Sequence, residues 1–501
     1  MNKVLFVSIN ARYSHSSLAA LYLAKENSLE FTINQSEDYI LGEILRDRPG
    51  LIAFSVYIWN SEIVSRLVSF IKAVEPQTYI IIGGPEIWRE NWRYWQSVGA
   101  DIGVEGHGEI EFTEILKDYN SGKKWESDCY IGRAPAFFDA DYSGFNKQKI
   151  AYIEGSRGCY NSCSFCLSGA DSIRYKDETR VLQECLQLES VGVSLVKFVD
   201  RSFNANPARA RRIWKELLER DSLTKYHFEI AADFLTQEDF LILKNAASRF
   251  QFEIGVQTAN PNALKIIGRK TNTRKVIEAT KKLTALGVHT HADLIAGLPG
   301  DSLKEFENSF NMVYAARPNA LQLGFLKILP GTELKRRAKE LGIIYKSRPP
   351  YTVLATREIN FWELNLLRLI AQIINLFYNS ARFQKTLAFL EKLYKSAFEL
   401  YKDLAQYFEK NNYHSVSQSK ETKYNILYDF AINKGVAPLC AAELLKFDML
   451  SYESVRKFPD WISSYYIYDD KKVSMKRALH KFFIDLDDGT ERIWEQEFIY
   501  L

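Results

Sequence analysis

The sequence predicts an α/β protein in three parts: an N-terminal Rossmann-like domain, a central partial (β/α)6 TIM-like barrel and a helical C-terminal domain. Three observations support this prediction. Short apolar runs alternate with helical patterns up to about residue 115, a second alternating series begins at Lys149, and the pattern turns helical after about residue 345. We therefore expect domains at residues 1–117, 149–345 and 346–501, with residues 118–148 as a linker that contains turn-forming residues such as Pro135.

The N-terminal part shows the pattern of a parallel, doubly wound sheet. Apolar runs at Lys3–Asn10, Leu51–Trp59 and Tyr79–Ile82 predict buried strands, with helical patterns between them. Turn-forming or polar residues follow at Gly83–Pro85 and Glu105–Glu109. Open α/β sheets bind their ligands beyond the carboxyl ends of the strands, so these turns predict a cofactor crevice.

The central part contains six strand candidates separated by helical patterns, which is the pattern of an incomplete βα barrel. The candidates are Ile150–Glu154, Leu195–Asp200, His227–Ala232, Gln251–Gln257, His289–Ala296 and Leu321–Leu329. In the C-terminal part, Glu358–Lys410 has a helical period without Gly or Pro, whereas the polar stretch Asn411–Lys423 predicts a loop. The many aromatic residues of the helical stretch are more typical of a core than of a cofactor site.

Charge and hydropathy narrow the classes of function. Sixty-five basic and 62 acidic residues leave a net charge of +3, which gives no support for sequence-independent binding to nucleic acid. The most apolar helical stretch, Leu366–Phe377, is shorter than the roughly 20 residues of a membrane span and includes Arg368. The N-terminus shows no secretory signal, so we expect a cytoplasmic protein without a membrane span.

Three of the six cysteines lie within eight residues: Cys159, Cys163 and Cys166 form a C-x3-C-x2-C motif after the first barrel strand. Thiolates on so short a loop can each reach a different iron of one 4Fe-4S cluster, and three ligands leave one iron open. A structural zinc site is the main alternative, but it needs four protein ligands, and no further cysteine pair or nearby histidine completes the set. The remaining cysteines stand alone and are expected to be buried apolar residues: Cys129, Cys185 and Cys440.

The cysteine motif, with Phe165 before its last cysteine, resembles the signature of the radical S-adenosylmethionine (SAM) superfamily, and residues 1–345 resemble its cobalamin-binding subclass. This resemblance implies a 4Fe-4S cluster on Cys159, Cys163 and Cys166 whose open iron chelates SAM. An electron from the cluster then splits SAM to give a 5'-deoxyadenosyl radical, which abstracts unactivated hydrogen atoms. The resemblance also implies an electron donor such as flavodoxin or ferredoxin, and it places Phe165 near the adenine.

Further motifs resemble those of the coproporphyrinogen-dehydrogenase-like branch: Phe252–Gln257, Ile267-Gly268-Arg269 and Asp293–Gly300. In that branch the Gln, Arg and Asp approach SAM, because an arginine can pair with its carboxylate while acceptors hold its hydroxyl or ammonium groups. The usual Gly-Gly-Glu after the second barrel strand is replaced by Val199-Asp200-Arg201-Ser202. Acids at strand ends also often cap the next helix instead of binding a ligand. The candidate SAM-binding residues are Phe165, Asp200, Glu229, Gln257, Arg269 and Asp293.

The N-terminal part resembles the cobalamin-binding domain of the same subclass through Ser55-Val56-Tyr57, Gly83–Glu86 and the turn from Gly106 to Glu109. Glycines let the backbone approach a flat macrocycle. The Asp-x-His-x-x-Gly motif that supplies a histidine to cobalt in methionine-synthase-like domains is missing, and His107 stands where the pattern has Glu. The alternative is a Rossmann-like domain that binds no cobalamin and only packs on the barrel. The candidate cobalamin-binding residues are Ser55, Gly83, Gly84, Gly106 and Gly108.

The leading hypothesis is a cobalamin-dependent radical SAM enzyme that transfers a methyl group to an unactivated carbon of a small molecule. One alternative keeps the radical chemistry but leads to rearrangement, ring formation or ring contraction of a small molecule. Another is a cobalamin or redox sensor with a non-catalytic cluster, although a sensor has no need of the motifs around Arg269 and Asp293. The C-terminal part resembles the uncharacterised helical extension of one group of these proteins, and a cap over the barrel mouth is a hypothesis for its role.

Overall fold

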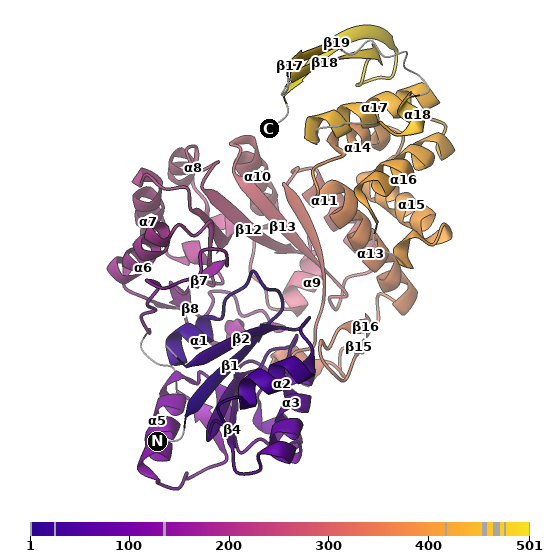
Figure 1. Cartoon of the computed structure of the whole chain (residues 1–501). Coiled ribbons are helices and arrows are strands. Elements are labelled where there is room, and N and C mark those ends of the chain that lie inside the picture. The colour runs from indigo at the N-terminus through magenta and orange to yellow at the C-terminus, as the bar shows by residue number, and fades with distance from the viewer. Residues whose placement is uncertain are drawn as a thin grey trace. The chain divides into compact units, whose positions relative to one another are not determined.

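The computed structural model describes residues 3–24, 27–133, 137–415, 418–452, 458–463, 471–474 and 477–499 (Figure 1). The chain divides into two compact units. The first comprises Met1–Gly255, Leu264–His289 and Leu326–Arg357, and the second comprises Val256–Ala263, Thr290–Phe325 and Glu358–Leu501. The predicted fold class is confirmed, since parallel α/β sheets precede a helical C-terminal region. Pro135 of the expected linker lies outside the described residues, and the domain boundaries stay predictions.

In the first unit, six parallel strands form a sheet in the order β2-β1-β3-β4-β5-β6. All five residues of β3 are buried, as expected for a strand that is covered on both faces. The sequence did not predict β2, an edge strand with one buried residue, or β6, which lies in the expected linker. The strands are β1 (Val4–Asn10), β2 (Ser28–Thr32), β3 (Leu51–Ser55), β4 (Tyr79–Gly83), β5 (Ile102–Gly106) and β6 (Cys129–Gly132). The helices are α1 (Leu18–Leu23), α2 (Glu37–Leu45), α3 (Ser61–Val74), α4 (Trp92–Ser97) and α5 (Glu109–Ser121).

Four of the predicted barrel strands also belong to this unit, and they pair in parallel in the order β7-β10-β11-β12. Side chains of a strand alternate between two faces. On one face, the rings of Phe198, Phe228 and Phe252 pack together and against Trp214 of α7. Residues at the alternate positions are polar, so the face of these strands away from α7 offers charged groups: Lys197, His227, Glu229 and Glu253.

The cysteine motif begins directly after strand β8, the second of the strands in this part of the first unit. The strands are β7 (Ala151–Ile153), β8 (Ser156–Arg157), β9 (Arg174–Tyr175), β10 (Leu195–Phe198), β11 (Lys225–Ile230), β12 (Phe250–Gln257), β15 (Ile344–Tyr345) and β16 (Val353–Ala355). The helices are α6 (Glu178–Val191), α7 (Pro207–Glu219), α8 (Gln237–Leu243), α9 (Pro261–Ile266), α10 (Thr273–Ala285) and α12 (Glu333–Arg337).

The second unit contains the remaining two predicted barrel strands, β13 and β14, which pair in parallel, and the helical C-terminal region. Helix α17 is buried on all sides and forms the centre of that region. The chain ends in an antiparallel sheet, β17-β18-β19, that the sequence did not predict. The strands are β13 (His289–Ala296), β14 (Ala320–Phe325), β17 (Lys471–Ser474), β18 (Arg477–Ile484) and β19 (Glu491–Ile499). The helices are α11 (Leu303–Tyr314), α13 (Phe361–Ile373), α14 (Gln384–Glu391), α15 (Ala397–Lys410), α16 (Lys420–Asn433), α17 (Pro438–Tyr452) and α18 (Asp460–Ser463).

None of the helices among the described residues combines the length and the apolar character that a membrane crossing requires.

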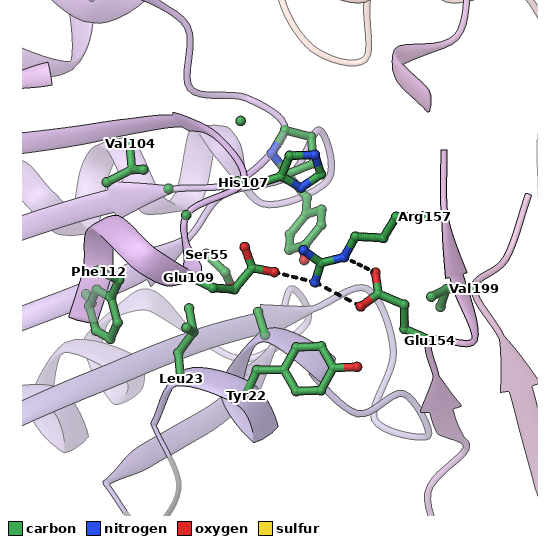
Figure 2. Close-up of a pocket in the computed structure, with 18 of the residues that line it drawn as sticks. Tyr22, Leu23, Ser55, Val104, His107, Glu109, Phe112, Glu154, Arg157 and Val199 are labelled. Carbon is green, nitrogen blue, oxygen red and sulfur yellow. Dashed lines mark hydrogen bonds and ion pairs between the residues drawn. The ribbon is translucent and has the colours of Figure 1, made fainter. Parts of the chain in front are cut away.

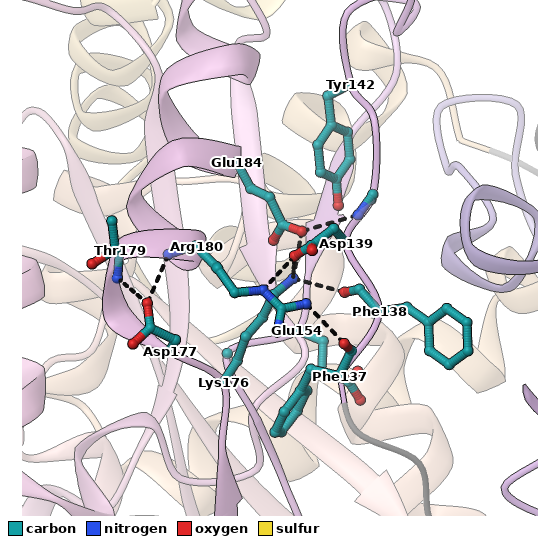
Figure 3. A network of polar contacts seen from close by, with 12 residues as sticks. Phe137, Phe138, Asp139, Tyr142, Glu154, Lys176, Asp177, Thr179, Arg180 and Glu184 are labelled. Atoms are coloured by element: carbon teal, nitrogen blue, oxygen red, sulfur yellow. Dashed lines mark hydrogen bonds and ion pairs between the residues drawn. The ribbon is translucent and has the colours of Figure 1, made fainter.

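Polar contacts connect the described part of the expected linker to helix α6 and the chain just before it (Figure 3). Lys176 is fully buried and donates to Glu184 of α6 and to the carbonyl oxygen of Phe138 (2.9 Å). Arg180 donates to the carboxylate of Asp139 (2.6 Å). The buried cation therefore joins the linker backbone to α6.

We expect Lys176→Met to lower the free energy of unfolding by about 3–5 kcal/mol, because it leaves the buried carboxylate of Glu184 without its cation. Lys304→Met is the control, since Lys304 is largely exposed and its ion pair with Glu307 contributes less than about 1 kcal/mol. Chemical denaturation measures both changes. Equal losses in the two variants would contradict a stabilising role of the buried pair.

Candidate functional site

The three cysteines of the motif lie on one loop that follows β8. Cys163 is buried, Cys159 and Cys166 are half-buried, and all three are free thiols. Gly158 opens the loop with a φ of 85°, and a Cβ there would lie 2.6 Å from the carbonyl oxygen of Ser172. Both the backbone conformation and this close contact require glycine, so Gly158 fixes the point at which the loop leaves the strand.

The segment that follows α9 holds the cysteine loop through backbone and amide contacts. The Ser164 amide donates to the carbonyl oxygen of Ile267 (2.8 Å). The Lys270 amide donates to Oδ1 of the buried Asn161 (3.1 Å). These contacts on both sides of Arg269 bring that residue to the cysteine loop.

Arg269 is therefore the predicted SAM contact that the structure places beside the cysteines. Its Nη1 lies 3.6 Å from Sγ of Cys163, and its Nη2 donates to the carbonyl oxygen of Gly255 (2.6 Å). Burial raises the pKa of the Cys163 thiol, whereas the Arg269 guanidinium acts to lower it. The site thus combines three free thiols with a fixed cation.

Among the described side chains, no three His, Cys, Asp or Glu residues are grouped so as to hold a single metal ion. A 4Fe-4S cluster does not need such a grouping, because each of its thiolate ligands binds a different iron. Three free cysteines on one loop provide the kind of ligand that iron–sulfur clusters use. The residues present therefore fit the cluster that the sequence predicts.

Asp200 holds the chain that leads into the cysteine loop. Its side chain is fully buried, and its carboxylate accepts hydrogen bonds from the Gly155 amide (2.8 Å) and the Ser156 hydroxyl (2.6 Å). Burial raises the pKa of Asp200 to about 6, and these two hydrogen bonds limit the rise. Both carboxylate oxygens are thus directed at the chain just before the cysteines, which is the geometry of a positioning residue.

Glu229 lies near the end of β11, beside Arg201, which follows β10. Nη1 of Arg201 lies 3.4 Å from Oε1 of Glu229, and Nε of Arg201 donates to the Ser168 hydroxyl (3.3 Å). Burial raises the pKa of Glu229 to about 7, although the arginine opposes the rise. Glu229 and the chain just after the last cysteine are therefore linked through Arg201.

The remaining predicted SAM contacts occupy strand ends or the cysteine loop itself. Gln257 ends β12 with a φ of 68°, a left-handed conformation that is uncommon for a residue other than glycine. Asp293 is half-buried on β13, opposite Gln322 of β14. Phe165 is half-buried between Ser164 and Cys166.

All five predicted cobalamin-binding residues line one pocket of the first unit, with a volume of about 390 Å³ (Figure 2). Gly84 has a φ of 110°, and a Cβ there would lie 2.6 Å from the carbonyl oxygen of Val56. The pocket continues between the sheet and helices α1 and α5, where its wall is apolar. That part is lined by Phe6, Leu23, Ala53, Ile81, Val104 and Phe112.

The same pocket reaches the cysteine loop through a buried arginine that the sequence analysis missed. Arg157 is 9% exposed and donates to both carboxylate oxygens of Glu154 (2.6 and 2.8 Å) and to Glu109 at the start of α5 (Figure 2). Gly158 follows Arg157 directly and also lines the pocket. The charges of Arg157, Glu154 and Glu109 thus join the first sheet to the start of the cysteine loop.

A second contact joins the pocket rim to the cysteine loop. Nε2 of His107 lies 3.2 Å from the carboxylate of Asp171, and the Asp171 carbonyl oxygen accepts a hydrogen bond from the Cys159 amide (3.3 Å). His107 stood out in the sequence only because it departs from the family pattern. Its partner could not be predicted, since the two residues are 64 positions apart in the sequence.

The sequence matches three family models in succession. These are the B12 binding domain over residues 8–116, the Radical SAM superfamily over residues 153–313 and DUF4080, a protein family of unknown function, over residues 339–495. The matched segments contain the pocket glycines, the cysteine loop and the C-terminal helices, respectively.

Two curated relatives and one solved structure show the extent of the likeness. The uncharacterized methyltransferase PH0819 of Pyrococcus horikoshii is 20% identical over 63% of this chain and 77% of its own length. The cobalamin-dependent radical SAM methyltransferase TokK of Streptomyces tokunonensis is 23% identical over 58% of this chain, and the match spans about half of TokK (49%). The structure of OxsB with aqua-cobalamin and SAM bound has a TM-score of 0.60 at 16% identity, covering 93% of this chain and 83% of OxsB. At that identity the likeness shows the fold.

Proposed function

We propose that the chain, which matches the models of the B12 binding domain, the Radical SAM superfamily and DUF4080, is a radical SAM enzyme that transfers a methyl group to an unactivated carbon of a small molecule. The observation that carries this proposal is the single pocket that reaches from the first sheet to the cysteine loop. Its wall contains Gly83 and Gly106 of the candidate cobalamin site together with Gly158 and Ser168 on either side of the cysteines. A methyl donor and a radical generator must both reach one substrate, and this pocket adjoins both sites.

The rim of the pocket can receive one face of a flat cofactor. Turns without side chains, at Gly83-Gly84 and Gly106, form its rim, and positive φ angles at Gly84 and Gly106 bring the backbone to the surface. The apolar slot next to Phe112 can hold an uncharged ring of the cofactor. When bound, the cofactors supply a radical derived from SAM at the cluster and a methyl group on cobalt.

The protein's own residues would bind and orient these groups. Cys159, Cys163 and Cys166 are proposed as the cluster ligands, and Arg269 as the partner of the SAM carboxylate, because its guanidinium lies beside Cys163. Asp200 is assigned the role of positioning the loop. The proposal also needs a one-electron donor such as flavodoxin or ferredoxin.

Four further residues remain proposed SAM contacts because of the motifs in which they occur: Gln257, Asp293, Glu229 and Phe165. Of these, Glu229 is the one that the structure links to the chain next to the cysteines, through Arg201 and Ser168. A carboxyl with a raised pKa can accept or donate a hydrogen bond near neutral pH, which suits contact with the ammonium or hydroxyl groups of SAM.

We expect Cys163→Ala to abolish SAM cleavage. The anaerobically reconstituted and reduced wild type should hold about four irons per chain and form 5'-deoxyadenosine from SAM. The variant should lose iron and form 5'-deoxyadenosine at least about 100-fold more slowly. Even the loss of a residue that only hydrogen-bonds to a metal ligand can lower activity by up to about 100-fold, and Cys163 is proposed as a ligand itself. Cys440→Ala is the control, because Cys440 is a buried residue of α17.

Zinc in place of iron, or 5'-deoxyadenosine at wild-type rate in Cys163→Ala, would overturn the proposal. Product mass separates the reaction classes, because methyl transfer adds one carbon to the substrate whereas rearrangement and cyclisation do not. A cofactor sensor would hold the cluster but show no turnover.

We expect Gly84→Ala to weaken cobalamin binding by at least about tenfold, because Cβ would strike the Val56 carbonyl oxygen and displace the turn at the pocket rim. Gly122→Ala is a matched control: Gly122 also has a positive φ, but its Cβ would meet open space. Titration with hydroxocobalamin, followed by absorbance, measures both. An unchanged affinity of Gly84→Ala for hydroxocobalamin would mean that cobalamin binds at another site, and no binding by the wild type would mean that the protein does not take up cobalamin.

A further inference from the structure

The charged residues in the pocket wall form two ion-paired groups and one further cation. Arg157 is neutralised by Glu154 and Glu109, and His107 faces Asp171. The cation left over is Arg201, whose acidic neighbour Glu229 is not part of the wall. Arg201 is therefore the cation of the wall whose acidic partner lies outside the wall.

The contacts of Arg201 are long, and its side chain is 52% exposed. Its hydrogen bond to Ser168 measures 3.3 Å and that to Glu229 measures 3.4 Å, at the weak end of the range for such bonds. Within the part of the chain that the structure describes, Nη2 of Arg201 has no hydrogen-bond acceptor. The guanidinium can thus present two N–H groups to a ligand.

The backbone of Arg201 is nevertheless fixed. The preceding Asp200 is fully buried and bonded to the Gly155 amide and the Ser156 hydroxyl. Val199, which also lines the pocket, lies across it from Ser55 in Figure 2. Arg201 therefore belongs to the wall that faces the candidate cobalamin residues, next to the chain that leaves the last cysteine.

We propose that Arg201 binds a carboxylate of the substrate, an inference that rests on the proposed function and names the substrate's chemical class. Guanidinium and carboxylate groups pair through two parallel hydrogen bonds, and Arg201 has the donors for such a pair. A singly charged anion suits the site better than a phosphate dianion, because the Glu229 carboxyl lies 3.4 Å from the same guanidinium. The substrate is thus a small carboxylic acid.

Arg201 is assigned to the substrate because the other ligands have their own candidate residues. The SAM carboxylate has Arg269, which lies beside Cys163. The cobalamin candidates lie on the first sheet, from which Val199 is separated by the pocket in Figure 2. Arg201 lines the same pocket as the cobalamin candidates and bonds to Ser168, just after the last cysteine, so a substrate at Arg201 adjoins both proposed cofactor sites.

The test uses the full-length protein, reconstituted anaerobically with cluster, SAM and hydroxocobalamin, and a matched pair of probes. Phenylacetate carries an apolar ring and one carboxylate, and phenylacetamide differs from it only in lacking the charge. Equilibrium dialysis measures the affinity for each. We expect the wild type to bind the acid at least about tenfold more tightly than the amide.

In Arg201→Gln this preference should disappear, whereas Arg201→Lys should keep part of it, because a lysine retains the charge but not the paired donors. Arg274→Gln is the control, since Arg274 is 89% exposed on α10, and it should keep the full preference.

Three results would overturn the assignment: a wild type without preference for the acid, an Arg201→Gln variant with the wild-type preference, or a loss of SAM affinity in Arg201→Gln as large as the loss for phenylacetate. The last result would assign Arg201 to SAM. Formation of 5'-deoxyadenosine by the wild type is measured separately. If the wild type formed no 5'-deoxyadenosine, the proposed function would be wrong. The preference for the acid, and the loss of that preference in Arg201→Gln, would still test the anion site.

Discussion

The arrangement of the site depends on one buried ion network, in which the guanidinium of Arg157 contacts Glu154 and Glu109. A buried arginine costs several kcal/mol in lost hydration unless acceptors pair with it, and Glu154 and Glu109 supply this requirement for Nε and Nη2 of Arg157. Glu154 follows β7 and Glu109 begins α5, so this requirement holds the barrel and the first sheet at one spacing. The cysteine loop starts at Gly158, directly after Arg157, so its position relative to the first sheet is set by the same contacts.

Topology explains why the two candidate cofactor sites share a pocket. Ligands of open α/β sheets gather at the carboxyl ends of parallel strands. In the first sheet those ends carry the glycine turns after β4 and β5, and in the barrel they carry the cysteine loop after β7 and Arg201 after β10. The pocket is therefore formed where two sets of strand ends meet within the first unit, and both sets contribute polar residues to its wall.

Patterns within short stretches of sequence predicted the features of the site that depend on neighbouring residues alone. The cysteine spacing, the glycine turns and most buried strands follow from residue type and period, and all five pocket residues named from the sequence do line one pocket. Long-range pairings could not be predicted: Arg157 meets Glu109 across 48 residues, and the side chain of Asp200 points to Gly155 although its position also suits a ligand contact. The final sheet was not predicted, although in the structure its strand β18 alternates buried residues, at His480, Phe482 and Ile484, with less buried ones.

The central claim is that cobalamin and a 4Fe-4S cluster occupy the two ends of one pocket. It is tested most directly by the electron-spin relaxation of bound cob(II)alamin in the reduced, reconstituted protein. A neighbouring paramagnetic cluster speeds that relaxation, so we expect faster relaxation in the wild type than in the Cys163→Ala variant, which lacks a cluster ligand. Equal relaxation in both, or a protein that takes up no cobalamin, would contradict the account.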